Sequence, residues 1–244
     1  MTVSTRVLVA AAPDHPEGLG DALDVLSDEE RERMGRFRRP ADAASFAGGR
    51  ALVRLALAQL VGASPRELVF DTWCARCGST HGKPRLVEPP TEIEFNLSHA
   101  GPTLVLAVSS VPVGVDVERL DRRAEADVAG LAFADDERAE LAAVPAAERP
   151  SAFLACWTRK EALLKGLGHG LAVDPRSVSV TFLESDEPRV RRLPEEFGPA
   201  EAWSLVPLEG DDWIGAVAIR GSGATRVESA QDLLATWRGL AGSR

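Results

Sequence analysis

The sequence predicts an α+β protein made of two α+β halves of similar size. Segments that favour helices and segments that favour strands occur in blocks, helices then strands, twice along the chain, whereas a parallel α/β sheet would alternate single elements. The chain has 244 residues, 45% of them hydrophobic, which suffices for one large domain or two small ones. The midpoint of the pattern lies near Ser110, so we expect an N-terminal half over 1–110 and a C-terminal half over 111–244.

The first half is expected to begin with a strand and two helices. The strand covers 6–11, and the first helix runs from Ser27 to just before Pro40. Ser27 followed by three acidic residues is typical of a helix N-terminus, because the hydroxyl caps the first turn and the acids favour its positive end. A second helix is expected over 41–61, with Gly62 as its stop. Short strands follow at 68–70, 85–87, 92–97, 103–108 and 113–117.

The second half repeats the order of helices and strands. Helices are expected at 121–133, 135–143 and 150–165, the last of them ending at Gly166. Strands are expected at 177–182, 203–207 and 213–219, with a polar loop at 184–199 and a final helix near 229–240. No residue-level repeat relates the halves, so the two-half prediction depends on the order of elements alone.

Charge, hydropathy and cysteine usage exclude several classes of protein. Acidic residues outnumber basic ones 37 to 28, a net charge of −9, which argues against a protein that binds nucleic acid by neutralising phosphates. No stretch approaches the run of about 18 apolar residues that a membrane helix needs, and the apolar segment 7–12 is too short for a signal peptide. Three cysteines, an odd number, fit a reducing compartment. We therefore expect a cytoplasmic protein with no membrane or nucleic-acid partner.

Two acidic residues share one face of an expected strand. Asp116 and Glu118 are two residues apart in the segment Val-Gly-Val-Asp-Val-Glu at 113–118, so both side chains point to the same side. Such a pair among valines is costly without a cation, and Mg²⁺ is usually held by one or two carboxylates plus substrate phosphates. An ordinary solvated strand face is the alternative. In the expected helix at 150–165, Glu161 and Lys165 also share a face, flanked by bulky apolar residues, which suits the floor of a cleft.

Other segments have the chemistry of an anion site. Ser98 and His99 precede Gly101, and a hydroxyl, an imidazole and backbone N–H groups near glycine can surround a phosphate; a structural histidine is the alternative. The turn Gly-Lys-Pro at 82–84 presents an ammonium. Lysine is rare among the 28 basic residues, which suggests that Lys83, Lys160 and Lys165 mark positions where a compact ammonium on a flexible stem is needed. Chance placement of three lysines in an arginine-rich chain is the alternative.

An incomplete zinc signature lies in the first half. Cys74 and Cys77 form a Cys-x-x-Cys pair followed by His81, which leaves a tetrahedral zinc site short of a fourth ligand. A reduced loop is the simpler interpretation. A zinc-stabilised interaction module is the non-enzymatic alternative.

Four motifs in order resemble the Sfp-type 4′-phosphopantetheinyl transferases: Gly-Lys-Pro at 82–84, Phe-Asn-Leu-Ser-His at 95–99, Gly-Val-Asp-Val-Glu at 114–118 and Trp-Thr-x-Lys-Glu-x-x-x-Lys at 157–165. The resemblance implies that family's fold, two halves in a pseudo-twofold arrangement with the active site at their interface. It also implies a magnesium enzyme that transfers the 4′-phosphopantetheine arm of coenzyme A to a serine of an apo carrier protein and releases adenosine 3′,5′-bisphosphate. The carriers would be acyl or peptidyl carrier domains of fatty-acid, polyketide or non-ribosomal peptide synthases.

The resemblance also implies roles for individual residues at the reacting pyrophosphate. Asp116, Glu118 and Glu161 would hold Mg²⁺. Lys165 would neutralise charge on the pyrophosphate, and Lys160 would assist nearby. Glu161, directly or through a metal-bound water, is the best candidate base for the incoming serine hydroxyl. Such parts suit attack on a pyrophosphate, which needs charge neutralisation and positioning more than covalent chemistry.

The coenzyme A contacts are implied in the same way. Ser98 and His99 would bind phosphates, and Lys83 and Pro84 the nucleotide end. Family members often place lysines in the first helix, where this chain has arginines; Arg50 is our first candidate for the 3′-phosphate and Arg33 our second, since guanidinium forks suit a phosphate monoester. From residue 31 to residue 54 there are seven arginines against two acids, a local charge of +5 that suits coenzyme A and an acidic carrier.

Two further expectations follow from this assignment. Another magnesium-dependent phosphotransferase is the alternative enzyme, although no Gly-x-x-x-x-Gly-Lys-[Ser/Thr] phosphate loop is present. Because both halves of the composite site lie in one chain, no second copy is needed, and a monomer is expected.

Overall fold

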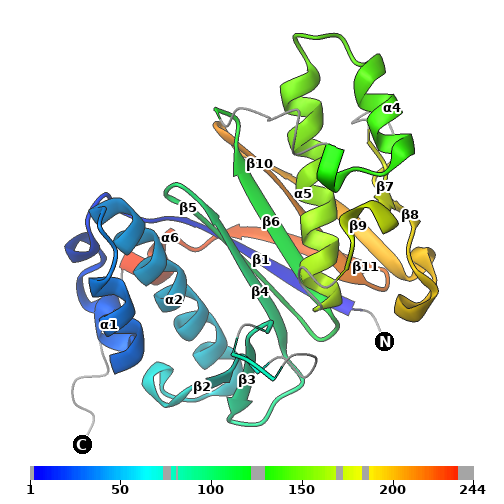
Figure 1. Cartoon of the computed structure of the whole chain (residues 1–244). Helices are drawn as coiled ribbons and strands as arrows, with labels where there is room; N and C mark the ends of the chain where they lie inside the picture. Colours follow the sequence, from blue (N-terminus) through cyan, green and yellow to red (C-terminus); the bar gives the residue numbers. More distant parts are fainter. Residues whose placement is uncertain are drawn as a thin grey trace, which may run out of the picture.

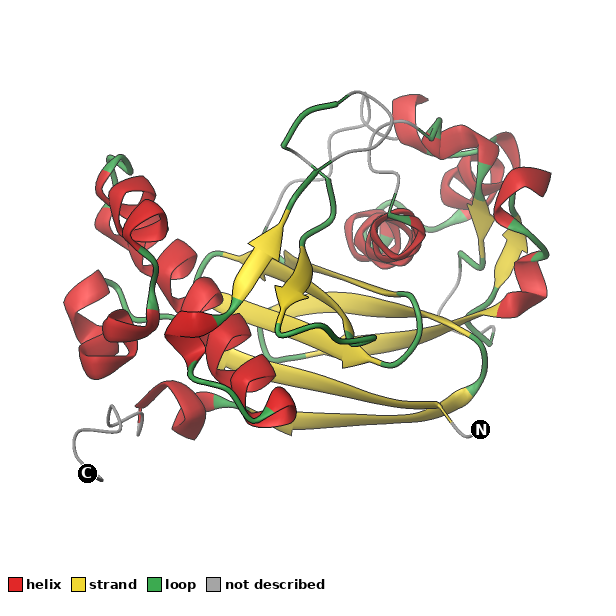
Figure 2. Cartoon of the chain, turned by 90° about the horizontal axis from the view of Figure 1, so that it is seen from below, coloured by secondary structure: helices red, strands yellow, loops and turns green. Residues whose placement is uncertain are grey.

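The computed structural model describes residues 3–73, 78–80, 82–121, 130–168, 173–182 and 187–235. Two sheets form the centre of the molecule, and one long helix packs on each of them (Figure 1). Viewed from below, the strands are stacked in the middle and the helices lie outside them (Figure 2). The predicted class, an α+β fold with two similar halves, is confirmed.

The first sheet has the strand order β11-β1-β5-β4. β1 (Val3–Ala11), β5 (Thr103–Ser109) and β4 (Glu94–Ala100) are antiparallel neighbours, whereas β11 (Gly223–Ser229) runs parallel to β1. Helix α2 (Pro40–Val61) covers one face of this sheet and forms a core with it. Gly62, in the left-handed region at φ 69°, ends α2 as expected.

The second sheet has the strand order β6-β10-β9, all antiparallel. It contains β6 (Val113–Arg119), β10 (Trp213–Arg220) and β9 (Trp203–Glu209), and α5 (Arg149–Leu167) packs on it. The valines of β6 belong to a separate core between the two sheets, together with Val7, Val105 and Ala107 of the first. Alternation along the strand then places Asp116 and Glu118 on the opposite face, toward α5.

Smaller elements decorate both sheets. The N-terminal lobe adds α1 (Asp28–Gly35), α6 (Gln231–Ala235), the hairpin of β2 (Val69–Asp71) and β3 (Arg85–Glu88), and the 3₁₀ segments Pro16–Val25 and Pro65–Glu67. The C-terminal lobe adds α4 (Asp135–Ala143), the pair of β7 (Ser179–Val180) and β8 (Val190–Arg192), and the 3₁₀ segments Pro175–Ser177, Glu195–Phe197 and Ala200–Ala202.

Two predicted helix ends were wrong. The predicted cap at Ser27 is present, as one half of a capping box with reciprocal hydrogen bonds to Glu30, but α1 ends at Gly35. Pro40 stands at the first position of α2 and holds Arg39 in an extended conformation, so the two helices are separate. Helix α5 continues through Gly166, and Gly168, at φ 76°, ends it.

Four strand and boundary predictions also need correction. β11 was not predicted, because its polar sequence lacks the alternation of a half-buried strand; most of its side chains are exposed. It returns to the first sheet with α6, so the range 111–244 does not keep all its elements in the second lobe. β8 lies in the expected polar loop, and β7 covers only two residues of the strand predicted at 177–182. Of the helix predicted at 121–133, residues 122–129 lie outside the described residues.

Gly114 allows α5 to approach β6 more closely than any other residue would. A β-carbon there would lie 2.0 Å from the carbonyl oxygen of Ala162 and 2.3 Å from the amide nitrogen of Gly166, both backbone atoms of α5. We expect Gly114→Ala to lower the free energy of unfolding by about 3 kcal/mol or more, because neither backbone atom can move aside. Urea unfolding measures this, with Gly35→Ala as the control, since a β-carbon at Gly35 meets nothing within 4 Å. Equal stability of the two variants would contradict the packing argument.

Candidate active site

The two sheets meet along their edge strands β4 and β6. Asn96 on β4 accepts a hydrogen bond from the backbone N–H of Val115 on β6, at 2.8 Å from Oδ1 to nitrogen. The residue two positions on, Ser98, points the same way, because alternate residues of a strand share a face. Its hydroxyl therefore faces the boundary between β4 and β6. We call this boundary, which joins the two halves, the seam.

A cluster of three side chains occupies this seam, one from each of β4, β6 and α5. The ammonium Nζ of Lys165 donates to Oδ1 of Asp116 at 2.6 Å and to Oγ of Ser98 at 3.2 Å. The Ser98 hydroxyl donates to the same Asp116 oxygen at 3.1 Å. We call Ser98, Asp116 and Lys165 the seam cluster. All three residues are predicted site residues, and the structure brings them together.

Asp116 is the buried centre of the seam cluster. Asp116 is 5% exposed, and its second carboxylate oxygen, Oδ2, has no hydrogen-bond partner within the described part of the chain. Burial raises the pKa of Asp116 above its ordinary value and the charge of Glu118 raises it further, while Lys165 opposes both effects. A buried carboxylate oxygen without a partner is suited to one more cation.

The other two expected metal ligands lie nearby on the same elements, but the three carboxylates are not gathered. Glu118 accepts a hydrogen bond from Nε1 of Trp157 on α5 at 3.1 Å. Glu161 is half-buried one helical turn before Lys165. Among the described residues, no three acidic, histidine or cysteine side chains form a group that could hold a metal. The residues fit a cation held by one or two carboxylates and completed by phosphate oxygens of a substrate.

A second cationic region lies on the α2 side of β4. His99 points to the face opposite Ser98, as expected for neighbours on a strand. Desolvation lowers the pKa of the imidazole, and so do the charges of Lys165 and Arg50, while Asp42 opposes them. His99 is therefore neutral near pH 7.

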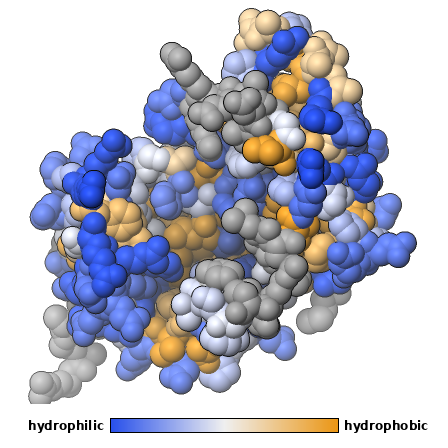
Figure 3. Space-filling model, viewed as in Figure 1, coloured by the Kyte–Doolittle hydropathy of each residue, from blue (hydrophilic) through white to orange (hydrophobic). Residues whose placement is uncertain are grey.

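Arg33 of α1 and Arg50 of α2 share one aromatic ring. Their guanidinium carbons lie 5.1 Å and 5.7 Å from the ring centroid of Phe46. Burial lowers the pKa of Arg50; Glu30 raises it in opposition, and the charges of Arg33 and Arg54 lower it further. Two guanidinium groups held close together suit the binding of an anion. The surface over α1 is predominantly hydrophilic (Figure 3).

Comparisons with known proteins identify the family. The model described as "4'-phosphopantetheinyl transferase, N-terminal" matches residues 13–111, and the "4'-phosphopantetheinyl transferase superfamily" model matches residues 112–218. The 4'-phosphopantetheinyl transferase HetI of a Nostoc species is 33% identical over 219 residues, covering 86% of this chain and 85% of the relative. A 4'-phosphopantetheinyl transferase of Bacillus subtilis is 30% identical over 189 residues, 76% of this chain and 80% of the relative. The chain belongs to the 4′-phosphopantetheinyl transferase superfamily.

The seam cluster of this phosphopantetheinyl transferase draws on both family models. Ser98 lies in the N-terminal match, and Asp116 and Lys165 lie in the superfamily match. A solved holo-[acyl-carrier-protein] synthase of Thermotoga maritima aligns with 46% of this chain and 64% of its own, at 20% identity and a TM-score of 0.39. Within the described residues, no helix of the transferase combines the length and apolarity that crossing a membrane requires.

The structure does not bring Lys160 to the seam cluster. Its side chain is buried on another face of α5, where Nζ bonds to Glu137 of α4 at 2.5 Å and to the carbonyl oxygen of Val178 at 2.6 Å. An ammonium committed to two buried acceptors cannot reach a substrate phosphate. The expected role of Lys160 at the pyrophosphate therefore does not fit its position.

Lys83 is also committed to protein acceptors. Its Nζ lies 2.7 Å from Oε2 of Glu94 and 2.9 Å from the carbonyl oxygen of Val113, so it joins the loop before β3 to the seam instead of presenting a free ammonium. A role at the nucleotide end requires Lys83 to exchange Glu94 for a phosphate. Pro84, next to it, is half-buried. The residues of the incomplete zinc signature, Cys74, Cys77 and His81, lie outside the described residues.

Three contributors to the site were not predicted. Asn96 joins the halves, Trp157 holds Glu118, and Phe46 gathers the two arginines. The sequence could have indicated Asn96 as a site residue, because it shares a strand face with Ser98. It could not have indicated Phe46, since an aromatic residue in an apolar helix indicates a core position.

The His99 environment gives a measurable prediction. NMR titration of the imidazole is expected to give a pKa below the ordinary value of about 6.5, and Lys165→Met is expected to raise it by removing a nearby positive charge. Because the folded pKa lies below the unfolded one, the contribution of His99 to stability is present above the unfolded pKa and is lost as the pH falls from there through the folded pKa. A His99→Asn variant assigns the signal among four histidines, and Lys83→Met serves as the control. An unchanged pKa in Lys165→Met would contradict the proximity of the two groups.

Proposed function

We propose that this transferase moves the 4′-phosphopantetheine arm of coenzyme A to a serine hydroxyl of an apo acyl or peptidyl carrier protein, with Mg²⁺, and releases adenosine 3′,5′-bisphosphate. The family membership supplies the reaction class. The observation that carries the assignment of the site is the seam cluster, in which a lysine ammonium and a buried carboxylate with an unpartnered oxygen meet between the halves. Both halves come from one chain, which supports a monomeric enzyme.

The reaction displaces one phosphate ester from the pyrophosphate of coenzyme A. The carrier serine oxygen forms a bond to the phosphorus that bears the pantetheine arm, and the bond from that phosphorus to the bridging oxygen breaks. The leaving adenosine bisphosphate takes the electron pair, and the serine proton passes to a base. Lys165 lies where it can leave Asp116 for the phosphate oxygens, since its side chain is 31% exposed. Glu161, on the same face of α5, is the proposed base.

Asp116 and Glu118, with Glu161, are the proposed holders of Mg²⁺. The unpartnered Oδ2 of Asp116 supports this choice. When bound, the ion would neutralise charge on the pyrophosphate. Ser98 belongs to the seam cluster and His99 is the next residue of β4, and we propose that both contact coenzyme A phosphates. Carriers of fatty-acid, polyketide or non-ribosomal peptide synthases are the proposed protein substrates.

Intact-mass analysis tests the reaction directly. An apo carrier incubated with the enzyme, coenzyme A and Mg²⁺ is expected to gain about 340 Da, the mass of the transferred arm. No gain on any of several carrier classes would sink the proposal. Tightly bound zinc in a protein without magnesium-dependent transfer would favour the interaction-module alternative. Transfer of a different phosphoryl group would favour another phosphotransferase.

The proposed base has its own test. Glu161→Gln is expected to abolish transfer, because the amide cannot accept the serine proton. Circular dichroism and thermal unfolding serve as folding controls, and they should match the wild type since Glu161 is only half-buried. A Glu161→Gln enzyme that still transfers the arm at the wild-type rate would remove this residue from the mechanism.

The arginine pair on Phe46 tests the placement of the 3′-phosphate. Arg50→Gln is expected to raise KM for coenzyme A by about 10-fold to 150-fold, the loss expected for a charged hydrogen bond worth about 1.5 to 3 kcal/mol. KM for dephospho-coenzyme A, which lacks this phosphate, should change little. Arg36→Gln is the matched control, because Arg36 is exposed and pairs with Glu32 on α1. Equal losses with both substrates would place the 3′-phosphate elsewhere.

A further inference from the structure

We propose that Glu137 is a positioning residue of this transferase, which acts through its buried ion pair with Lys160. The pair fixes the rotation of α5 and thereby directs Glu161 and Lys165 toward β6. This inference rests on the proposed function, which assigns roles to Glu161 and Lys165. It gives the second of the three lysines a role away from the substrate.

The Glu137–Lys160 pair is completely enclosed and nearly saturated with hydrogen bonds. The side chains of Glu137 and Lys160 are 0% and 1% exposed. Glu137 accepts from the ammonium and from Ala134 N–H through Oε2, and from Val180 N–H through Oε1 at 2.9 Å. The ammonium also donates to the carbonyl of Val178. One carboxylate thus ties the start of α4, the middle of α5 and the β7 strand together.

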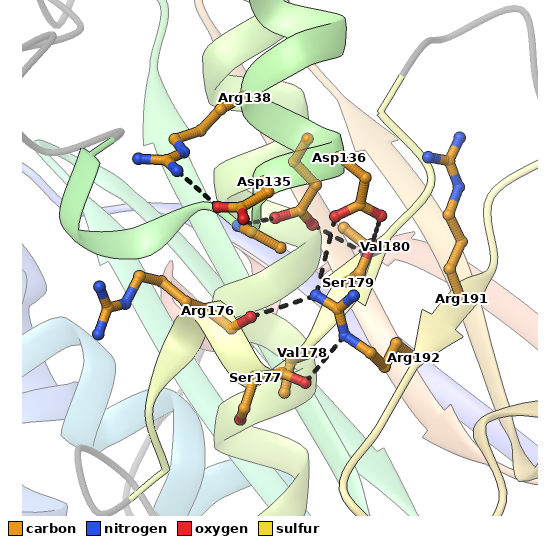
Figure 4. A network of polar contacts seen from close by, with 12 residues as sticks. Asp135, Asp136, Arg138, Arg176, Ser177, Val178, Ser179, Val180, Arg191 and Arg192 are labelled. Carbon is orange, nitrogen blue, oxygen red and sulfur yellow. Dashed lines mark hydrogen bonds and ion pairs between the residues drawn. The ribbon is translucent and has the colours of Figure 1, made fainter.

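The platform that carries Glu137 is itself held by polar contacts (Figure 4). The hydroxyl of Ser179 donates to Oδ2 of Asp136 at 2.5 Å, beside Glu137 on α4. Arg192 of β8 pairs with the other oxygen of Asp136 at 3.7 Å and donates to the carbonyls of Arg176 and Ser177. Glu137 therefore projects from a braced junction of α4, β7 and β8.

Contacts on two sides hold α5 in place. On one side its backbone at Ala162 and Gly166 lies against Gly114 of β6, where no side chain fits. On the other side Lys160 bonds to Glu137 and the Val178 carbonyl, and the buried Arg159 donates to the carbonyl of Thr181 at 2.8 Å. Both sets of contacts act on residues within about one and a half turns of Glu161.

Helix geometry links the direction of the Lys160 side chain to the directions of its neighbours on α5. Successive residues of an α-helix are about 100° apart, at 3.6 residues per turn. Fixing the direction of Lys160 therefore fixes the direction of Glu161, the next residue, and of Lys165 one turn later. Stability alone does not explain a buried pair, because replacing both charges by uncharged groups of similar size is often neutral for stability. A specific arrangement of α5 is what the charges add.

The test removes both charges together, with Glu137→Gln/Lys160→Met, because either change alone leaves one buried group unpaired. We expect this double variant to fold, to lose at least tenfold in kcat, and to keep KM for coenzyme A within twofold, since Arg33 and Arg50 lie in the other lobe. Glu140→Gln is the matched control, because it breaks the α4–β8 pair with Arg191, which includes no residue of α5. The control should keep the wild-type kcat.

A second readout does not depend on transfer activity. Protein labelled with ¹⁵N-lysine has only three side-chain ammonium groups, so Lys83 and Lys165 can be assigned by substitution. In the double variant the Lys165 signal should shift, whereas the Lys83 signal should not. If the double variant fails to fold, Glu137→Gln/Lys160→Gln, which also removes both charges but keeps a hydrogen-bonding group at each position, provides the same comparison.

The outcomes separate the two proposals. A folded double variant with kcat within twofold of wild type, or with an unshifted Lys165 signal, overturns the positioning role and leaves the pair purely structural. A wild type that modifies no carrier overturns the proposed function, and the Lys165 signal alone then decides whether Glu137 positions α5.

Discussion

The negative charge of Asp116 has to be balanced where water does not reach it, and the structure around the seam follows from that constraint. A buried carboxylate beside a second acid on the same strand face is unfavourable unless cations and hydrogen-bond donors surround it. Lys165 comes from α5 and Ser98 from β4, and both bond to Asp116. The charge of Asp116 therefore holds the helix of the C-terminal half and the edge strand of the N-terminal half against β6. The contact that neutralises Asp116 thus also joins the two halves.

The close approach of α5 to β6 is the steric condition for this arrangement. Only the absence of a side chain at Gly114 lets the helix backbone lie against the strand, and the flexible stem of Lys165 then spans the remaining distance. The valines on the other face of β6 are needed for a different purpose, the core between the sheets. One strand therefore serves a dry core on one side and a charged site on the other, as its alternating sequence allows.

The basic residues divide according to what surrounds them. Of the three lysines, one faces the seam, one is enclosed with Glu137, and one holds a loop against Glu94. The arginines on α1 and α2 instead form a cationic surface, where Arg33 and Arg50 lie over a shared ring. A chain with a net charge of −9 can therefore still offer a local site for a polyanion.

The sequence by itself determined the local features. Ser27 with its acids set the start of α1, Gly62 set the end of α2, and the spacing of Asp116 and Glu118 placed two acids on one strand face, because helix capping and strand alternation depend only on neighbours in the chain. The four motifs were sufficient to indicate the family.

Features that depend on partners far along the chain were decided by the tertiary structure. β11 pairs with β1 across more than two hundred residues, and its own polar sequence holds no trace of that pairing. Lys160 and Lys165 stand five residues apart in one motif, yet only the packing of α4 and β6 on different faces of α5 decides that one is enclosed in the protein and the other faces the site.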